Sequence, residues 1–148
     1  MSTEQPQQPQ KPQIPQDMKA FNEALIAEFR ANGGKLASGP FAGREPMLLT
    51  TTGAKSFTER TVVVGYRKYG DAYAVIASNN GADREPHWFA NLRANATAAV
   101  ELGPEKFRVK ARVAEGAERA EVAKLIDYYE RQQALTSREI PIVVLERI

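Results

Sequence analysis

Residues 106–113 alternate strictly between apolar and charged side chains, and this run constrains the fold more than any other feature of the chain. Phe107, Val109, Ala111 and Val113 take every second position, with Lys or Arg between them. Because successive side chains of a strand point to opposite faces, one face of this strand is expected to be buried and the other solvated. The run therefore predicts an antiparallel sheet with one wet face.

Shorter runs rich in β-branched and apolar residues predict the other strands. They cover residues 47–52, 60–68, 72–78, 98–102 and 140–145. Turn residues stand between neighbouring runs at Tyr69-Gly70-Asp71 and at Gly103-Pro104-Glu105, where antiparallel strands need tight connections. We therefore expect a mainly β (α+β) fold with a sheet of about six antiparallel strands, curled into a barrel that removes its exposed edges.

Three segments predict helices at the ends of this sheet. Residues 17–32 repeat apolar side chains at three- and four-residue spacing, with Asp17 as a cap and Gly33 as the start of a stop signal. Residues 86–95 begin with a proline, which suits a first helical turn. Residues 117–133 predict a longer helix.

Residues 1–16 contain four prolines at three-residue spacing, six glutamines and almost no apolar side chains. Such a segment cannot pack and is expected to be a disordered or polyproline II tail. The remaining residues 17–148 suffice for one domain and are too few for two. No membrane-length apolar run and no signal peptide is visible, so a cytoplasmic protein without an integral membrane segment is expected.

The chain has no Cys and one His, His87. This composition excludes a disulfide framework, a thiolate nucleophile and a Cys/His zinc site, and no metal site is expected. Redox chemistry would need a bound organic cofactor. Basic residues outnumber acidic ones between positions 44 and 112, whereas the reverse holds from 113 to 148. This weak asymmetry suits a small anionic ligand better than nucleic acid.

Hydroxyl and basic side chains gather in residues 49–60, which leave one predicted strand, turn at Gly53 and enter the next. Lys55 and Arg60 could surround an oxyanion while Ser56 and backbone N–H groups donate hydrogen bonds. The spacing of a P-loop and its following helix are missing. A polar hairpin turn with solvated charges explains the same pattern at least as well.

Residues 77–92 bring the end of a strand next to the start of a helix. Free backbone N–H groups and the positive end of the helix dipole would face the same neighbourhood, favouring an anionic or electron-rich ring. His87 and Trp88 could add an aromatic wall, although a single tryptophan is more often part of a core.

Tyr128 and Tyr129 lie on the predicted C-terminal helix. A phenol that faces a cleft can donate a proton to an anionic intermediate. A pair of this kind also commonly packs one ring inward and leaves the other at the surface, and the two interpretations remain open.

Several motifs resemble the deazaflavin-dependent nitroreductase family of actinobacteria. They keep their order and spacing over residues 45–148, and they are Leu49-Thr50-Thr51-Thr52-Gly53, Lys55-Ser56 with Arg60, Ala77-Ser78, Gly81-Ala82, Pro86-x-Trp88-x-x-Asn91-Leu92-x-Ala94-Asn95 and Ile140-Pro141-Ile142-Val143-Val144. The resemblance implies a split β-barrel like that of flavin-binding pyridoxamine-phosphate-oxidase relatives. It also implies reduced coenzyme F-420, a deazaflavin, as the hydride donor.

The resemblance assigns cofactor-binding positions to several parts of the chain. The loop that holds the phosphate and the acidic tail is matched by Lys55, Ser56, Phe57 and Arg60. Positions that line the deazaflavin, largely through backbone groups, are Leu48, Leu49, Thr50, Val64, Ala77, Ser78, Asn79, Asn80, His87, Trp88 and Asn91. Tyr129 matches a tyrosine implicated at the substrate pocket and is the candidate catalytic residue.

This sequence departs from the family pattern at four positions. Phe57 stands where relatives usually have Gly, Ala54 where a basic residue is common, and Asn79 where Lys is common. The phosphate loop is therefore expected to have fewer cations than in relatives. Gly65 replaces a tyrosine of the nitroimidazole-reducing relatives, which argues against nitroimidazole activation.

The expected activity is transfer of hydride from reduced F-420 to conjugated acceptors, with a proton from Tyr129 or water. Enones, unsaturated lactones such as coumarin or aflatoxin-like compounds, and quinones are the acceptor classes that the resemblance suggests. A non-catalytic carrier of F-420 or of an apolar ligand is the alternative. An FMN-dependent oxidase on the same scaffold fits less well, and a nucleic-acid-binding barrel fits the modest charge poorly. Both a monomer and a homodimer are compatible with the sequence.

Overall fold

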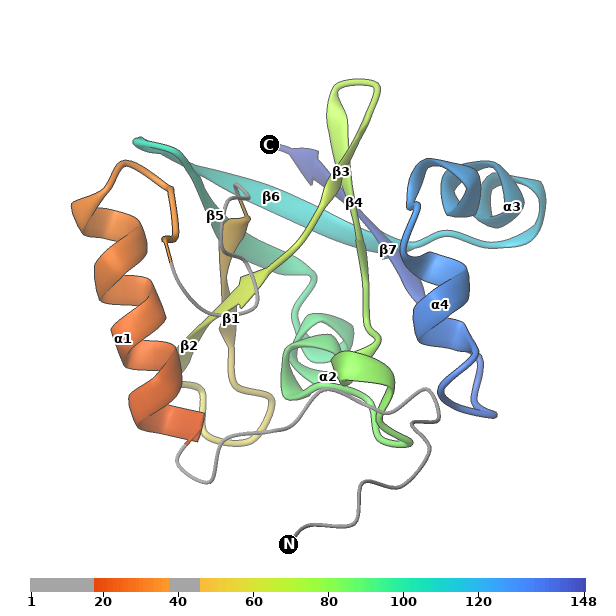
Figure 1. Cartoon of the computed structure of the whole chain (residues 1–148), viewed down its shortest axis with the longest axis horizontal. Coiled ribbons are helices and arrows are strands. Elements are labelled where there is room, and N and C mark those ends of the chain that lie inside the picture. The colour runs from red at the N-terminus through yellow and green to blue at the C-terminus, as the bar shows by residue number, and fades with distance from the viewer. Residues whose placement is uncertain (1–17, 38–45) are drawn as a thin grey trace, which may run out of the picture.

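The computed structural model describes residues 18–37 and 46–148, and it shows a rolled antiparallel sheet flanked by helices (Figure 1). Seven strands form one sheet in the order β2-β1-β5-β6-β7-β4-β3. They are β1 (Met47–Thr52), β2 (Glu59–Val64), β3 (Arg67–Tyr69), β4 (Ala72–Ile76), β5 (Thr97–Leu102), β6 (Glu105–Val113) and β7 (Ile142–Arg147). All six neighbouring pairs are antiparallel, which confirms the expected fold class.

The connection between β2 and β3 shows how far the sheet is rolled. These strands stand at opposite ends of the strand order, yet only Gly65 and Tyr66 separate them in the sequence. Three Cα-to-Cα steps span at most about 11 Å, so the two ends of the sheet must lie close together. Within the described residues no strand pairing joins β2 to β3, and the barrel is therefore split. The single strand expected over residues 60–68 is in fact two strands that belong to opposite edges.

The helices lie around the rolled sheet, with α1 on one side and α3 and α4 on the other (Figure 1). They are α1 (Met18–Ala31), the 3₁₀ helix η1 (Asn79–Gly81), α2 (His87–Ala94), α3 (Gly116–Leu125) and α4 (Tyr129–Gln133). The helix expected over residues 117–133 is broken, because Ile126 leaves the helical conformation and is buried at 2% exposure. The expected cap Asp17 and the tail of residues 1–16 lie outside the described residues.

Apolar side chains are buried on both faces of the sheet. The interior cluster, inside the rolled sheet, contains Met47, Leu49, Val75, Ala77, Trp88, Phe89, Leu92, Ala98, Val100, Phe107, Val109, Val143 and Leu145. On the outside, Leu48 packs under α1 with Phe29, and Ile76 packs under α3 and α4. Leu48 and Leu49 thus belong to opposite faces, as the period of a strand requires.

The alternating strand β6 matches its expectation except at its end. Phe107 and Val109 are buried, Arg108 and Lys110 are exposed, and Val113 is 39% exposed. The expected turns connect β3 to β4 and β5 to β6, and each contains a glycine with positive φ. Local patterns therefore predicted these strands and turns, whereas they did not predict the division of residues 60–68 into β2 and β3.

Candidate functional site

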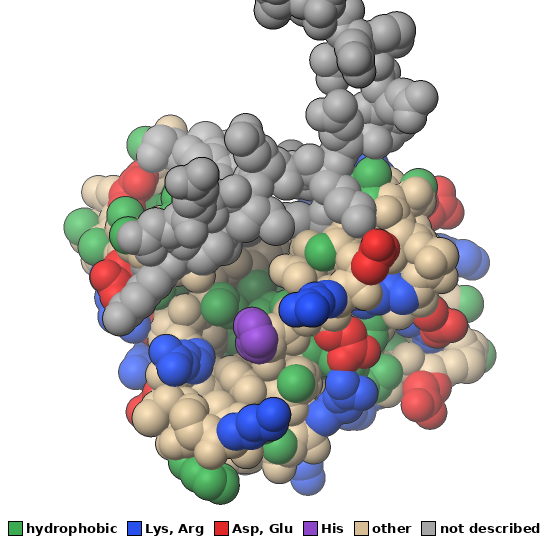
Figure 2. All heavy atoms as spheres, turned by 90° about the horizontal axis from the view of Figure 1, so that it is seen from below, with side chains coloured by type: hydrophobic (Ala, Val, Ile, Leu, Met, Phe, Trp, Pro, Cys, Tyr) green, Lys and Arg blue, Asp and Glu red, His purple; other side chains and the backbone are tan. Residues whose placement is uncertain are grey.

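The loops after β1 and β4 and the start of α2 lie at one end of the barrel, at the bottom of Figure 1. Figure 2 views this end directly and shows the single histidine near the middle of the face, with Lys and Arg side chains around it. A hydrogen bond from the Ala54 N–H to the Asn91 Oδ1, 3.1 Å long, joins the first loop to α2. Segments far apart in the sequence therefore meet here.

The cationic loop, residues 53–60, is held in shape by its own hydrogen bonds. The Gly53 N–H donates to the Thr58 carbonyl at 2.7 Å, and the Phe57 N–H donates to the Gly53 carbonyl at 3.0 Å. The Ser56 and Thr58 hydroxyl oxygens lie 2.8 Å apart. Lys55 is exposed at the turn, and no carboxylate of the described residues pairs with it.

Arg60 brings a second unneutralised cation to the mouth of the barrel. It lies opposite Thr51 in the ladder between β1 and β2. It shares a face of β2 with Val62 and Val64, which pack against the interior cluster. The Arg60 side chain is exposed, and its charge has no carboxylate partner in the described part of the chain. Lys55 and Arg60 are therefore available to an anion.

Phe57 has a backbone conformation that suits glycine. Its φ is 58°, in the left-handed region, and its side chain is 80% exposed. A side chain at such a φ costs about 1–2 kcal/mol because the Cβ approaches the carbonyl oxygen. Glycine adopts this conformation without that cost, which gives a physical reason for the glycine that the resemblance leads us to expect at this position.

Asn91 is the buried link between the cationic loop and the barrel. It is 8% exposed, and its Oδ1 accepts from the Ala54 N–H. Its Nδ2 donates to the Thr51 hydroxyl at 3.0 Å. Both ends of the Asn91 amide are thus engaged in hydrogen bonds within the protein. We therefore expect Asn91 to affect ligand binding mainly by holding the cationic loop in place.

His87 and Trp88 take different environments at the start of α2. His87 is exposed, and it stands one helical turn from Asn91, on the side of α2 that meets the cationic loop. Trp88 is 7% exposed and packs in the interior cluster, with its ring edge-on to Phe89. The structure therefore favours the core interpretation of Trp88 over the aromatic wall.

Residues 77–84 run from the end of β4 towards α2. Ala77 is fully buried, whereas Ser78 and Asn79 are half-buried. Asn79 has a φ of 48°, and its Nδ2 donates to the Arg84 carbonyl at 3.2 Å. The side chain of Asn80 lies outside the described residues. Sequence reasoning missed Arg138, whose guanidinium donates to backbone carbonyls of this segment.

The candidate positions on β1 and β2 lie within the sheet and are buried or half-buried. Leu48 and Leu49 are fully buried, and the Thr50 hydroxyl lies 2.7 Å from that of Thr61. Residues 48–50 also pair with β2 on one side and β5 on the other, so their backbone is engaged in the sheet. Val64 is half-buried against the interior cluster. The structure does not bring the Leu48 and Leu49 side chains to an open surface, and ligand contacts of this group stay a prediction.

Tyr129 begins α4 and packs with Tyr128 on the outer side of the sheet. Its hydroxyl accepts a hydrogen bond from Arg119 and lies 3.2 Å from the Gln133 Oε1, to which it donates. Both rings are half-buried. The Tyr129 hydroxyl is therefore already engaged within the protein, and its role as proton donor stays a prediction.

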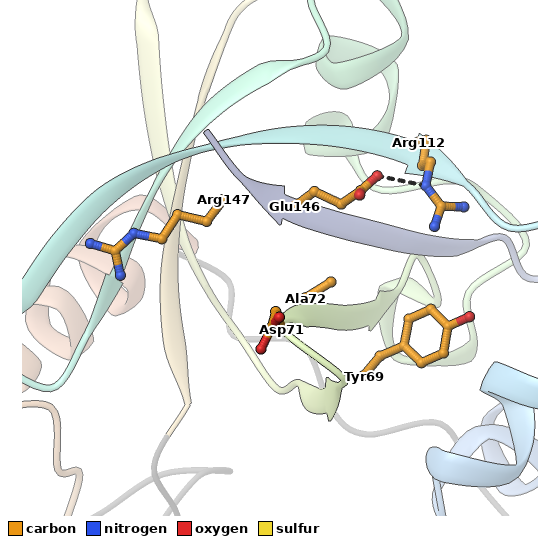
Figure 3. Close-up of a pocket in the computed structure, with 6 residues that line it drawn as sticks. All are labelled: Tyr69, Asp71, Ala72, Arg112, Glu146 and Arg147. Atoms are coloured by element: carbon orange, nitrogen blue, oxygen red, sulfur yellow. Dashed lines mark hydrogen bonds and ion pairs between the residues drawn. The ribbon is translucent and has the colours of Figure 1, made fainter.

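A shallow depression at the other end of the barrel has a different character (Figure 3). Its volume is ≈ 310 Å³, and its lining includes Tyr69, Arg112 and Glu146. Arg112 pairs with Glu118 and, at 2.7 Å, with the Glu146 Oε1, and the Tyr69 hydroxyl donates to Glu118 at 3.1 Å. Hydrogen bonds from Arg112 lower the pKa of Glu118, and the bond to Glu118 raises the pKa of Tyr69. We call Tyr69, Arg112, Glu118 and Glu146 the paired cluster.

Comparison with known proteins identifies the family. The sequence profile of the family described as F420H(2)-dependent quinone reductase matches residues 23–147. This chain belongs to that family. It is 34% identical over 128 residues to the F420H(2)-dependent quinone reductase Rv1261c of Mycobacterium tuberculosis, covering 82% of this chain and 86% of the relative.

Solved structures agree with this assignment. A structure described as an F420-H2 dependent reductase (FDR-A) superposes with a TM-score of 0.61 at 34% identity, covering 68% of this chain and 93% of that one. A second, described as a domain-swapped dimer, gives a TM-score of 0.63 at 30% identity, with 84% and 93% coverage. The expected split-barrel fold, family and oxidoreductase class are confirmed.

Reduced coenzyme F-420 is the cofactor of this family, as expected, and the loop end of the barrel fits such a group. An anionic arm requires cations without carboxylate partners, which Lys55 and Arg60 supply. The paired cluster, whose arginine is neutralised by two carboxylates, does not meet this requirement. Among the described helices, none has the length and apolar character needed to cross a membrane.

Proposed function

We propose that this protein reduces quinones and related conjugated acceptors with hydride from reduced coenzyme F-420. One observation carries the proposal. Two cations without carboxylate partners, Lys55 and Arg60, lie at the end of the barrel where the cationic loop is bonded to α2 through Asn91. The family of F420H(2)-dependent quinone reductases supports the cofactor and the quinone class.

In this proposal the cationic loop binds the phosphate and the acidic tail of the cofactor. Lys55 offers a mobile point charge, and Arg60 offers a planar fork suited to a phosphate or carboxylate. The loop is held to the barrel by Asn91, so the charges have a defined place relative to α2. We propose that residues 77–79 and His87 border the ring on the adjoining side.

The chemistry requires two electrons and two hydrogens per quinone. The bound cofactor supplies a hydride, and a proton from elsewhere completes the hydroquinone or the saturated product. The protein would hold the acceptor close to the ring and place donors at the developing oxyanion. We propose Tyr129 or a water molecule as the proton source. Tyr129 would have to exchange its hydrogen bond to Gln133 in order to donate.

Enones and unsaturated lactones such as coumarins have the same electron-poor conjugated carbon as quinones. We propose that they are acceptors as well, beyond the quinones for which the family is named.

Carrier function remains the alternative, and it requires binding without turnover. Oligomeric state, monomer or homodimer, is a separate prediction that gel filtration with light scattering checks.

The test begins with purified protein and a fluorescence titration against F-420 and against FMN. We expect F-420 to bind in preference to FMN. Oxidation of the reduced cofactor is then followed by absorbance with menadione, coumarin or a simple enone as acceptor. Turnover with menadione supports the proposal, and tight F-420 binding without turnover of any acceptor supports the carrier. The Tyr129→Phe variant separates the proton sources, because only a phenol donor makes kcat fall while F-420 affinity is kept.

A further inference from the structure

We propose that Arg138 is a positioning residue for the cofactor, because its guanidinium fixes the backbone of residues 77–84. Residues 77–79, at the start of this segment, are proposed above to border the deazaflavin ring, and the contact with the ring rests on that proposal. The hold of Arg138 on the segment is visible in the structure of the protein alone. Arg138 lies between α4 and β7 and belongs to none of the motifs that carried the family resemblance.

The Arg138 guanidinium lies within hydrogen-bond distance of four carbonyl oxygens of this segment. The Arg138 Nε donates to the Ala82 carbonyl at 2.9 Å. The Nη2 lies 3.0 Å from the Ala77 carbonyl oxygen and 2.9 Å from that of Ser78. It lies 3.1 Å from the Arg84 carbonyl oxygen. Residues at both ends of the segment therefore bind the same nitrogen, which closes the chain into a loop around the guanidinium.

Two of the four carbonyls also have a partner within the segment. The Gly81 N–H donates to the Ser78 oxygen at 2.9 Å, and the Asn79 Nδ2 donates to the Arg84 oxygen. The Ala77 and Ala82 carbonyls lie outside the short 3₁₀ helix and accept from Arg138. Buried or half-buried carbonyls without partners cost free energy, which the guanidinium removes. Asn79, with its φ of 48°, sits inside this loop, so its left-handed conformation is held from both sides.

The segment that carries Arg138 is itself seated against the loop. The Thr136 hydroxyl donates to the Asp83 Oδ1 at 2.8 Å. A Cβ on Gly81 would lie 2.6 Å from the Leu135 Cβ, so the two backbones approach as closely as glycine permits. These contacts fix the distance between Arg138 and the carbonyls that it binds.

A second set of bonds supports Arg138 from the side of α4. The Gln133 Nε2 donates to the Arg138 carbonyl at 2.6 Å, and the Gln133 Oε1 accepts from the Ile140 N–H at 2.9 Å. The Tyr129 hydroxyl donates to the same Oε1. Tyr129 is thereby connected to the ring-bordering segment through Gln133 and Arg138.

The charge of Arg138 is directed at the backbone and not at an acid. Within the described residues it forms no ion pair, and its Nη1 is buried without a hydrogen-bond partner. Lysine could keep the charge but not the geometry, because an ammonium group lacks the planar fork that reaches carbonyls at two separated places. Arg138→Lys therefore removes the hydrogen-bond geometry of the guanidinium while it keeps the positive charge.

The test compares Arg138→Lys and Arg138→Met with the control Arg147→Lys. Arg147 forms an exposed ion pair with Glu105 and lies on β7, away from the loop end. Amide hydrogen exchange of the protein without cofactor reports the loop, and fluorescence titration reports F-420 affinity. Loss of one hydrogen bond to a charged group corresponds to about tenfold in an equilibrium constant. We expect at least about tenfold faster exchange in residues 78–84 and at least about tenfold weaker F-420 binding in both Arg138 variants, with neither change in the control.

Added methylguanidine provides a readout that general destabilisation would not give. It should restore F-420 affinity to Arg138→Ala and leave Arg147→Ala unchanged. If Arg138→Met does not fold, Arg138→Lys and this rescue provide the same measurements.

Each remaining outcome decides one part of the inference. Unchanged exchange in Arg138→Lys and Arg138→Met overturns the hold on the loop. Faster exchange with unchanged F-420 affinity overturns the positioning role. If the unaltered protein binds no F-420, the proposed function fails and the positioning role fails with it, whereas faster exchange in the variants still supports the hold.

Discussion

The cationic loop and the paired cluster use similar side chains for opposite purposes. In the paired cluster, Arg112 contacts two carboxylates, Glu118 and Glu146. In the cationic loop, Lys55 and Arg60 have no carboxylate partner among the described residues. Arginine beside two acids stabilises the protein locally and offers little to a ligand. Cations without such partners contribute little to folding and are available for an anion.

The two regions also differ in the type of residue that adopts a left-handed backbone conformation. Gly70, in the turn between β3 and β4 near the paired cluster, has a φ of 59°, and Phe57 in the cationic loop has a φ of 58°. The same left-handed conformation is thus filled by glycine at one end and by an exposed phenylalanine at the other. Strain of this kind concentrates at sites where function constrains the chain.

The largest expected effect follows from removing the two unpartnered cations. We expect Lys55→Ala with Arg60→Ala to weaken F-420 binding by about a hundredfold, since each charge-assisted contact is worth about 1.5 kcal/mol or more. The loss should shrink as salt is raised, because salt screens exposed charges. Fluorescence titration at two ionic strengths measures both.

Arg112→Ala with Arg147→Ala is the matched control, since it also removes two positive charges. We expect F-420 affinity to change less than twofold. Equal losses in the two double variants would show that net charge, and not the cationic loop, governs binding.

Asn91→Ala is expected to have the next largest effect, which is a loss of stability. It removes the buried partner of the Ala54 N–H and of the Thr51 hydroxyl. Leaving a buried donor or acceptor without a partner costs about 1–3 kcal/mol. We expect the free energy of unfolding to fall by about 2 kcal/mol in urea denaturation.

Tyr69→Phe is the counterpart in the paired cluster, because it removes the hydroxyl of a half-buried tyrosine that is bonded to Glu118. We expect a much smaller loss of stability, since water can replace this bond. A larger loss from Tyr69→Phe than from Asn91→Ala would contradict the view that Asn91 anchors the cationic loop.

Local patterns sufficed for most of the fold. The alternation of residues 106–113 predicted β6, and the turn at Gly103 predicted its pairing with β5. The strand expected over residues 60–68 divides at Gly65 and Tyr66 because the rolled sheet brings its two edges together and the chain crosses from one edge to the other. The helix expected over residues 117–133 divides because Ile126 is drawn into the core. Both corrections depend on tertiary packing, which a local pattern does not contain.

The site could be predicted less completely, for a related reason. Charges on a turn, such as Lys55, are visible in the sequence as candidates. Whether a side chain is buried, as Trp88 and Leu48 are, depends on which elements cover it. Arg138 gave no usable signal, since its partners are backbone carbonyls more than fifty positions away along the chain.

Phe57→Gly tests the difference between the two backbones, because it places in the cationic loop the residue type that the turn at Gly70 already has. Removing the side chain relieves the left-handed strain, and we expect the protein to gain up to about 1 kcal/mol of stability in urea denaturation. Phe57→Ala is the control, because it removes the ring but keeps a Cβ at positive φ. A gain of equal size from alanine would show that the exposed ring, and not the backbone, is unfavourable.

The smallest expected effect concerns the pH dependence of stability in the paired cluster. Glu118 has a pKa below its ordinary value of 4.5 in the folded protein, chiefly because Arg112 donates hydrogen bonds to it. A carboxylate with a lowered pKa stabilises the folded state above its unfolded pKa, and this contribution is lost as pH falls through the folded value. The free energy of unfolding should therefore fall below about pH 4.5 less steeply in Glu118→Gln than in the unaltered protein. Lys55→Ala should keep the full slope, since no acid pairs with Lys55 among the described residues. A flattened slope in Lys55→Ala would mean that the cationic loop is coupled to an acid, and the contrast between the two ends of the barrel would then be lost.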